Sequence, residues 1–500
     1  MAAIIQQPHE SVLPEPTSEW RLDTATRLVR PLRGVELIVK SSEHFCDGNF
    51  QLTIMATVES PLSCKQLKRR QRAAWWRTRR VFPVVGVAFP SLDQASFDLY
   101  ETVEAAEQWA AQTCRVATNT TVSDVYLARS RQALDGITMT LVADPIRGAR
   151  GCVLNMSHTL IDLKIYGILQ EFINQLACPK TELGVDAVFW PETMANTIPR
   201  LPQSLSHAYS LRHQPTPKQL QDMLVVMQRS QERWGRSTIG IPLHPDYQHR
   251  PSRIHNKSVA FEPTETAAGF IFLKEAKVSL TAAFFACMTS GIAQTFPGNG
   301  DQEGAHLLFS ANGRRFLDLS ASNGLGPVAM PVIPAGMWLD AKNVNLRPTS
   351  RQGLLRLARA IEEAQNQDLT SPHIIAALDQ LAPGLVKAFA DSHNLPGGPS
   401  PPPSVGRPTL TSQGQFAQAV DATVKPGEDP LRMTDFNTGG RTTDPSVCFA
   451  LNSFRDELRF NLLFDEQFFD RHDVMHMGYT VARLFRRLIG EEQGVAMAKL

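Results

Sequence analysis

The sequence has 500 residues, which is too long for one simple domain and predicts two or three. Hydrophobic residues make up 43% and charged residues 20%, the composition of an ordinary globular protein with a sizeable core. The formal net charge is +1, so the chain lacks the strong basic excess of a nucleic-acid-binding protein, and we expect no nucleic-acid partner.

The sequence also predicts the compartment. No apolar run approaches the roughly 18 residues needed to cross a bilayer, so we expect no membrane span. The polar first 17 residues lack the apolar core of a signal peptide. The seven cysteines are dispersed, which indicates reduced thiols and a cytoplasmic protein. The final Ala498-Lys499-Leu500 resembles a Ser-Lys-Leu tail, so a peroxisomal location is the alternative.

The first part of the chain mixes strand and helix patterns. Apolar or alternating runs predict strands at residues 35–39, 50–58, 137–143 and 151–156. Helical spacing of apolar residues predicts helices at residues 62–80, 103–114 and 163–176. The period changes between Met156 and Asp162, so we expect a strand to end near the first and a helix to start near the second.

A proline-rich stretch follows, with one helical segment at residues 217–234. We interpret residues 181–257 as a crossover linker between an N-terminal domain of residues 1–180 and a C-terminal domain of residues 258–500. Strands are expected in the second domain at residues 306–311, 447–454 and 458–464. Helices are expected at residues 264–276, 280–294, 354–365, 373–382 and 470–490.

Two segments of the second domain contain helix-breaking residues. Pro383 and Gly384 should end or kink the helix that precedes them. Residues 396–408 are rich in proline, glycine and serine and are expected to form a flexible loop. The whole outline predicts an α/β fold of two layered units.

Several strong functional motifs are absent from the sequence. It contains no phosphate-binding loop of the Walker type, no His-Glu-x-x-His zinc helix and no Gly-x-Ser-x-Gly elbow. We expect no metal ion and no permanently bound cofactor.

The most informative site is His158-x-x-x-Asp162, between a predicted strand and a predicted helix. An imidazole has an unperturbed pKa of roughly 6.5 and can accept a proton from a hydroxyl or amine at neutral pH. The bare pattern is weak, since roughly 0.6 matches are expected by chance at ordinary composition. The alternative is a loop histidine whose ring is satisfied by a backbone carbonyl.

The context of this motif strengthens it. His158 follows Leu154-Asn155-Met156-Ser157, and Asp435-Phe436-Asn437-Thr438-Gly439 precedes two late strands. With these motifs, and with the segment ending in Arg314-Arg315, the sequence resembles the superfamily of chloramphenicol acetyltransferase, BAHD acyltransferases, condensation domains and fungal trichothecene O-acetyltransferases. The last group is closest in layout. The sequence departs from that pattern at Leu163, where glycine is usual, and in the middle of the late motif.

The resemblance implies two chloramphenicol acetyltransferase-like domains with an active-site channel at their interface. It implies that His158 is the general base, and that an acceptor hydroxyl attacks the thioester of acyl-CoA directly. Asp162 and Asp435 would be structural, with Arg314 or Arg315 as the partner of Asp435.

Further expectations concern the substrates and the oxyanion. Acyl-CoA would be the co-substrate and a small secondary-metabolite alcohol the acceptor, and we expect a monomer. A donor is needed for the tetrahedral oxyanion, for which Ser446, Thr438 or a backbone N–H group are candidates.

Alternatives stay open at this stage. A condensation-type enzyme would use a carrier-tethered donor, and a degenerate member would only bind one. The basic stretch at residues 65–80 suggests a nucleic-acid or nuclear-localisation patch, but a surface helix with solvated arginines is the simpler interpretation. Cys152 lies in an apolar strand, so we expect a buried inert thiol rather than a nucleophile.

Overall fold

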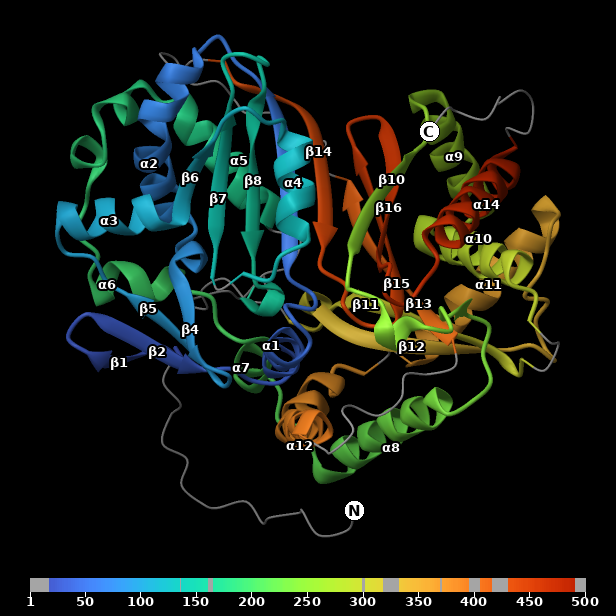
Figure 1. The fold of residues 1–500 in the computed structure, drawn as a ribbon. Helices are drawn as coiled ribbons and strands as arrows, with labels where there is room; N and C mark the ends of the chain where they lie inside the picture. Colours follow the sequence, from blue (N-terminus) through green and yellow to red (C-terminus); the bar gives the residue numbers. More distant parts are fainter. Residues whose placement is uncertain are drawn as a thin grey trace.

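The structure is a computed structural model that describes residues 18–134, 136–160, 165–298, 302–317, 332–368, 371–394, 405–415 and 430–490. Within these ranges two layered α/β halves lie side by side, one built around a five-stranded sheet and the other around a seven-stranded sheet (Figure 1). The prediction of an α/β fold with two layered units is confirmed.

The five-stranded sheet has the strand order β14-β3-β8-β7-β6. Its strands are β3 (Leu52–Glu59), β6 (Cys114–Ala117), β7 (Thr138–Ala143), β8 (Arg150–Met156) and β14 (Arg432–Gly440). The helices α2 (Cys64–Val81) and α5 (Ile165–Ala177) pack on one face. The helix α4 (Val122–Ser130) packs on the other. Successive strand residues point to opposite sides of the sheet, and since the residues of β7 and nearly all of β8 are buried, both faces need covering helices.

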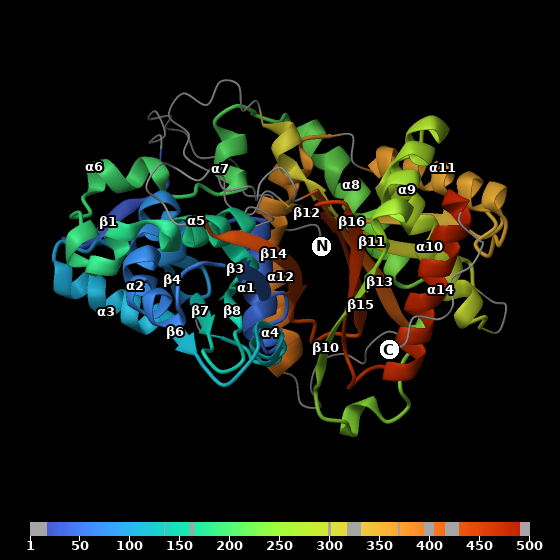
Figure 2. The same ribbon diagram turned by 90° about the horizontal axis from the view of Figure 1, so that it is seen from above.

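The strand β14 comes from the late part of the chain but completes the N-terminal sheet. It pairs antiparallel with β3, with Gly440 opposite Leu52 and Asn437 opposite Met55. Seen from above, β14 lies between the two halves and joins the N-terminal one (Figure 2). Its side chains also reach the other half, since the Phe436 ring lies 6.2 Å from the Phe454 ring, centroid to centroid.

A small sheet lies beside the N-terminal half, with the order β1-β2-β5-β4. Its strands are β1 (Arg21–Thr24), β2 (Arg27–Pro31), β4 (Val87–Ser91) and β5 (Gln94–Asp98). The turn η1 (Pro83–Gly86) leads into this sheet, and α3 (Val103–Thr113) follows it.

The strand expected at residues 35–39 is wrong, because this segment is the helix α1 (Val35–Phe45). Its buried residues are Val35, Glu36, Val39, Ser41, Ser42 and Glu43. Several of these positions repeat at intervals of four and three, which is the period of a helix. The apolar run at the start of this segment is too short to distinguish a helix from a strand. The later buried positions, which reveal the helical period, are occupied by polar residues.

The basic helix α2 has the buried apolar face that we expected, and several of its arginines are exposed, such as Arg72. Trp75 and Trp76 are fully buried beneath the helix. The expectation is wrong for Arg79, whose side chain is also buried and pairs with Glu192 at 3.0 Å. The tryptophan rings and the apolar stem of Arg79 gain by burial, and the buried guanidinium is tolerated because Glu192 pairs with it.

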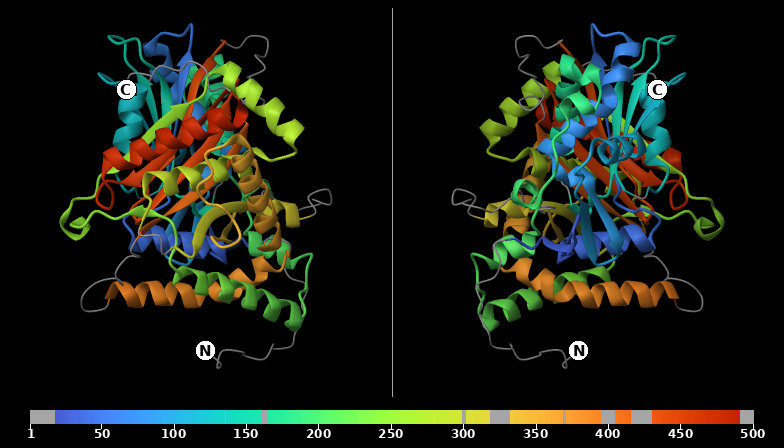
Figure 3. Two further views of the ribbon diagram at one scale, coloured as in Figure 1. Left: turned by 90° about the vertical axis from the view of Figure 1, so that its right-hand side faces the viewer. Right: turned by 90° about the vertical axis from the view of Figure 1, so that its left-hand side faces the viewer.

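Residues 181–257, interpreted as a linker, contain several short helical elements, one 18-residue helix and a short strand. These are η3 (Pro179–Leu183), η4 (Asp186–Val188), α6 (Met194–Thr197), η5 (Ile198–Arg200), α7 (Leu205–Ser210), α8 (Pro217–Trp234), the short strand β9 (Ile241–Pro242) and η6 (Tyr247–His249). The helix α8 has the predicted bounds, because Thr216 caps its N-terminus and Pro217 occupies its first position. It lies along the lower side of the molecule together with α12 (Figure 3).

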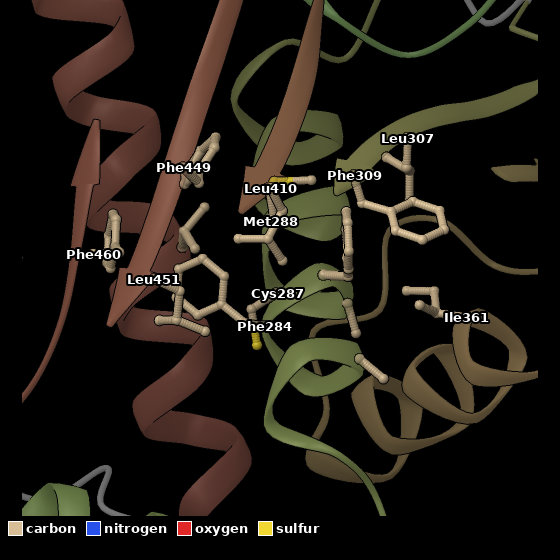
Figure 4. Packing of buried hydrophobic residues seen from close by; sticks show 14 of the residues in the cluster. Phe284, Cys287, Met288, Leu307, Phe309, Ile361, Leu410, Phe449, Leu451 and Phe460 are labelled. Carbon is tan, nitrogen blue, oxygen red and sulfur yellow. The ribbon is translucent and has the colours of Figure 1, made fainter. Parts of the chain in front are cut away.

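The seven-stranded sheet has the order β10-β16-β15-β13-β11-β12, with β9 paired to β13. The strands are β10 (Ile254–Ala260), β11 (Gly304–Asn312), β12 (Val332–Asp340), β13 (Val405–Gln415), β15 (Ser446–Phe454) and β16 (Glu457–Asp465). The helices α9 (Pro263–Ala276), α10 (Leu280–Thr295), α11 (Arg351–Asp368) and α14 (Arg471–Ile489) cover one face. Phe284 of α10 packs there against Phe449 and Phe460 (Figure 4).

Two expectations for the second half need correction. The helix α12 (Ile374–Asn394) continues through Pro383 instead of ending there. Pro383 and Gly384 are exposed, so the proline ring meets solvent rather than a packed neighbour. Residues 405–408, expected as part of a loop, begin the strand β13, while residues 396–404 lie outside the described residues.

Candidate active site

His158 stands where the sequence predicted it, just beyond the end of a core strand. The strand β8 ends at Met156, which is buried, and the turn η2 (His158–Leu160) begins two residues later. Ser157 and Thr159 on either side are buried, whereas His158 itself is half-buried. The turn therefore holds one partly accessible imidazole between two buried neighbours.

A carboxylate from α1 holds this turn. The Glu43 Oε1 atom accepts a hydrogen bond from the backbone N–H of His158 at 2.8 Å. The Ser157 hydroxyl lies 2.8 and 2.7 Å from the two carboxylate oxygens. The backbone N–H of Thr159 donates to the Ser157 hydroxyl at 3.1 Å. Two consecutive residues are thus bound to the Glu43 side chain, and Thr159 is linked to it through Ser157. The sequence analysis did not identify Glu43.

The environment of Glu43 is unusual for a charged group. Its side chain is 1% exposed, and burial raises the pKa of the carboxyl, although Lys40 and the hydrogen bonds from Ser157 and His158 act in the opposite direction. The Lys40 Nζ atom is 3.6 Å from the carboxylate. A buried carboxylate is costly unless donors satisfy it, and the turn supplies two of them.

Two of the predicted site residues cannot be placed. Asp162 lies outside the described residues, together with residues 161, 163 and 164. Arg314 belongs to the turn η7 (Gly313–Phe316), but its side chain is not among those described. The predicted roles of both residues stay predictions.

Asp435 lies on the strand β14. Its carboxylate pairs with Arg459 at 3.0 Å and accepts the backbone N–H of Phe436 at 2.9 Å. Arg459 also donates to the Phe436 carbonyl at 3.1 Å. The ion pair that the structure describes for Asp435 is made by Arg459 of β16, and the expected pairing with Arg314 or Arg315 stays a prediction.

The strand register separates Asp435 from His158. Asp435 is opposite Thr57, which is opposite Gly151. Gly440, at the end of β14, shares a row with Leu52 and Met156. Asp435 is five residues from that row, or about 17 Å along the strand. Asp435 and His158 therefore lie at opposite ends of the same sheet, while β14 runs from the Asp435 end toward the His158 end.

The two hydroxyl candidates for the oxyanion donor are engaged elsewhere. Ser446 donates to Asp444, and Thr438 donates to Gln413 at 2.6 Å. Thr438 also lies in a polar seam between the two sheets, where Asn461 donates to its carbonyl at 2.7 Å.

The predicted inert thiol is confirmed, since Cys152 is fully buried and burial raises its pKa. Across the described ranges, no three His, Cys, Asp or Glu side chains are grouped so that they could hold a metal ion. Within the same residues, no helix has the length and apolar character of a membrane span.

A cavity of about 700 Å³ opens at the Asp435 end of the sheet. Glu59, Arg150 and Arg432 are among its lining residues. His158 does not line it, so this cavity alone does not identify the reaction centre.

No model of a known protein family matches the chain. Among curated proteins, the chain is 27% identical over 522 residues to the acyl-CoA-dependent acyltransferase MAC2 of Pseudozyma antarctica, covering 93% of this chain and 95% of that protein. It is 24% identical over 531 residues to the acyl-CoA-dependent acyltransferase MAC1 of Mycosarcoma maydis, covering 93% and 88%. Among solved structures, TRI3 trichothecene 15-O-acetyltransferase from Fusarium sporotrichioides superposes with a TM-score of 0.75 at 14% identity, covering 96% and 99%.

The chain has the layout of a chloramphenicol acetyltransferase-like acyltransferase. The resemblance inferred from the sequence is thus confirmed, and so is the prediction of an acyltransferase. Both curated acyltransferases are matched along nearly their whole length, so the similarity covers the His158 half and the Asp435 half alike.

Proposed function

We propose that the protein transfers an acyl group, such as acetyl, from acyl-CoA to a hydroxyl of a small secondary metabolite. The observation that carries this proposal is the similarity to two acyl-CoA-dependent acyltransferases along 93% of the chain. The half-buried His158, held at the end of β8 by fixed neighbours, supports it.

In the proposed reaction His158 is the general base. Its imidazole takes the proton of the acceptor hydroxyl while the acceptor oxygen attacks the thioester carbonyl. The tetrahedral intermediate collapses, the carbon–sulfur bond breaks, and the thiolate of CoA takes up the proton that His158 holds, which restores the neutral imidazole. No acyl-enzyme is formed, so both substrates are bound at once. A thioester is already activated, and positioning together with one base suffices.

The remaining parts of the site follow from the described contacts. Because the hydroxyls of Ser446 and Thr438 donate to other side chains, a backbone N–H is the remaining candidate for the oxyanion donor. Asp435 keeps its proposed structural role, which its pair with Arg459 supports. Asp162 keeps its proposed structural role, and the substrates would meet in a channel between the two halves.

The test is acyl transfer from acetyl-CoA and longer acyl-CoAs to a panel of alcohols, measured as acceptor-dependent release of CoA. We expect His158→Ala to lower kcat by at least about 100-fold, the lower end of a general base's contribution. His472→Ala is the matched control, because His472 is an exposed residue of α14. It should leave kcat unchanged.

Two outcomes would contradict the proposal. Equal activity of wild type and His158→Ala would show that His158 is not the base. A folded wild type that binds no free CoA and reacts with no acyl-CoA would instead favour the carrier-tethered or degenerate alternative.

A further inference from the structure

We propose that Glu43 is a positioning residue for His158, acting through the backbone of the turn that carries the base. The inference rests on the proposed function and adds to it a residue from a different part of the chain. Glu43 lies on α1, and its carboxylate contacts the two successive residues Ser157 and His158 at 2.7 to 2.8 Å.

The contacts fix the turn at several points. The His158 N–H donates to one carboxylate oxygen, and the Ser157 hydroxyl bridges both oxygens. The Ser157 hydroxyl in turn accepts the N–H of Thr159. Since backbone atoms of residues 158 and 159 both enter this network, the direction in which the His158 side chain leaves the turn depends on Glu43.

Burial of Glu43 favours one conformation of the turn. The Glu43 side chain is 1% exposed, and an unsatisfied carboxylate there would be strongly destabilising. Its described donors are Lys40 and the His158 turn. The turn and the carboxylate therefore hold each other in one conformation, because a shifted turn would leave a buried charge with fewer donors.

The role assigned to Glu43 is geometric rather than electrostatic. Lys40 lies 3.6 Å from the carboxylate, so the pair brings little net charge to the imidazole. A side chain of the same shape that keeps one acceptor for the His158 N–H should therefore preserve the function. Glutamine has this property, since its amide oxygen can accept from His158 while its amide group donates to the Ser157 hydroxyl.

The first experiment compares Glu43→Met with Glu43→Gln. Methionine has a similar length but no hydrogen-bonding acceptor of comparable strength, so the turn loses its anchor. We expect Glu43→Met to lower kcat about 10- to 100-fold with little change in KM for acyl-CoA, since displacing a reacting group by about 1 Å costs up to ~100-fold. Glu43→Gln should stay within about threefold of wild type, because it keeps the geometry.

The matched control is Glu265→Met in the other half. Glu265 is also a buried helical carboxylate, 6% exposed and paired with Arg486 at 2.6 Å. Glu265→Met should lower the melting temperature but leave kcat unchanged. Equal losses of kcat in Glu43→Met and Glu265→Met would overturn the inference, and so would a loss in Glu43→Gln as large as that in Glu43→Met.

A double-mutant cycle separates positioning from general destabilisation. If Glu43 acts through His158, Glu43→Met should not lower the residual activity of His158→Ala any further. Multiplying losses would overturn the inference. Loss of activity in His158→Ala tests the proposed function separately, since that result does not depend on Glu43. If Glu43→Met fails to fold, Ser157→Ala in the same cycle removes one arm of the network and should show the same non-additivity with a smaller loss.

Discussion

The two ends of the five-stranded sheet are built differently. At one end, His158 leaves a turn whose neighbours are buried and whose backbone is bound by the 1% exposed carboxylate of Glu43. At the other end, Asp435 pairs with Arg459, and the Asp435 side chain is 41% exposed. A solvent-exposed ion pair contributes little to the free energy of unfolding, whereas a buried carboxylate that needs its hydrogen-bond donors holds them in one geometry.

This difference separates Asp435 from His158 by role. The buried network fixes the position of a group whose chemistry depends on fractions of an ångström. The exposed pair holds a strand edge that is already fixed by ladder hydrogen bonds and by the packing of Phe436. Changes at the His158 end should alter kcat, and changes at the Asp435 end should alter stability.

The largest change expected at the Asp435 end is from Phe436→Ala. The Phe436 ring is fully buried in the N-terminal core and contacts Phe454 of the other half. We expect a loss of about 3 to 5 kcal/mol in the free energy of unfolding, since a cavity replaces the ring. Urea denaturation measures it. A loss below about 1 kcal/mol would show that β14 is held by its polar contacts instead.

Asp435→Asn should have a much smaller effect. Its partner Arg459 keeps the Phe436 carbonyl and Glu457 as acceptors. The expected loss is about 1 kcal/mol or less, with kcat within about twofold of wild type. Denaturation and steady-state kinetics on the same preparation check both values. A tenfold loss of kcat with unchanged stability would give Asp435 a role in the reaction and erase the contrast between the two ends.

The smallest effect concerns pH at the His158 end. Burial raises the pKa of Asp444, which accepts from Asn49, a residue that follows α1. A carboxyl with a raised pKa in the folded state stabilises the fold below its ordinary pKa, and this stability is lost as pH rises through the raised value. Asp444→Asn should therefore decrease the fall in melting temperature between pH 4 and pH 7. An unchanged slope would show that Asp444 does not contribute to it.

The sequence was sufficient for the fold class and for the place of His158 at the end of a core strand. The strand ending at Met156 and the turn at His158 follow from the change of apolar period at this point. Glu43 could not be found in this way, because it is 115 positions from His158 and α1 had the apolar start of a strand. Arg459 as a partner of Asp435 could not be found for a similar reason, since the packing of β14 beside the C-terminal sheet decides that this arginine is near.

The origin of β14 has a consequence for how the protein is made. The Thr434 hydroxyl meets the carbonyl of Thr57, which is 377 positions earlier in the chain. While the ribosome is still synthesising the second half, β3 can pair with β8 on one side, but its other edge lacks the partner strand β14. An uncovered edge invites pairing with other chains. The five-stranded sheet is therefore completed only after almost the entire polypeptide has been made. A nascent chain that ends before residue 432 would leave this edge of β3 open to pairing with other chains.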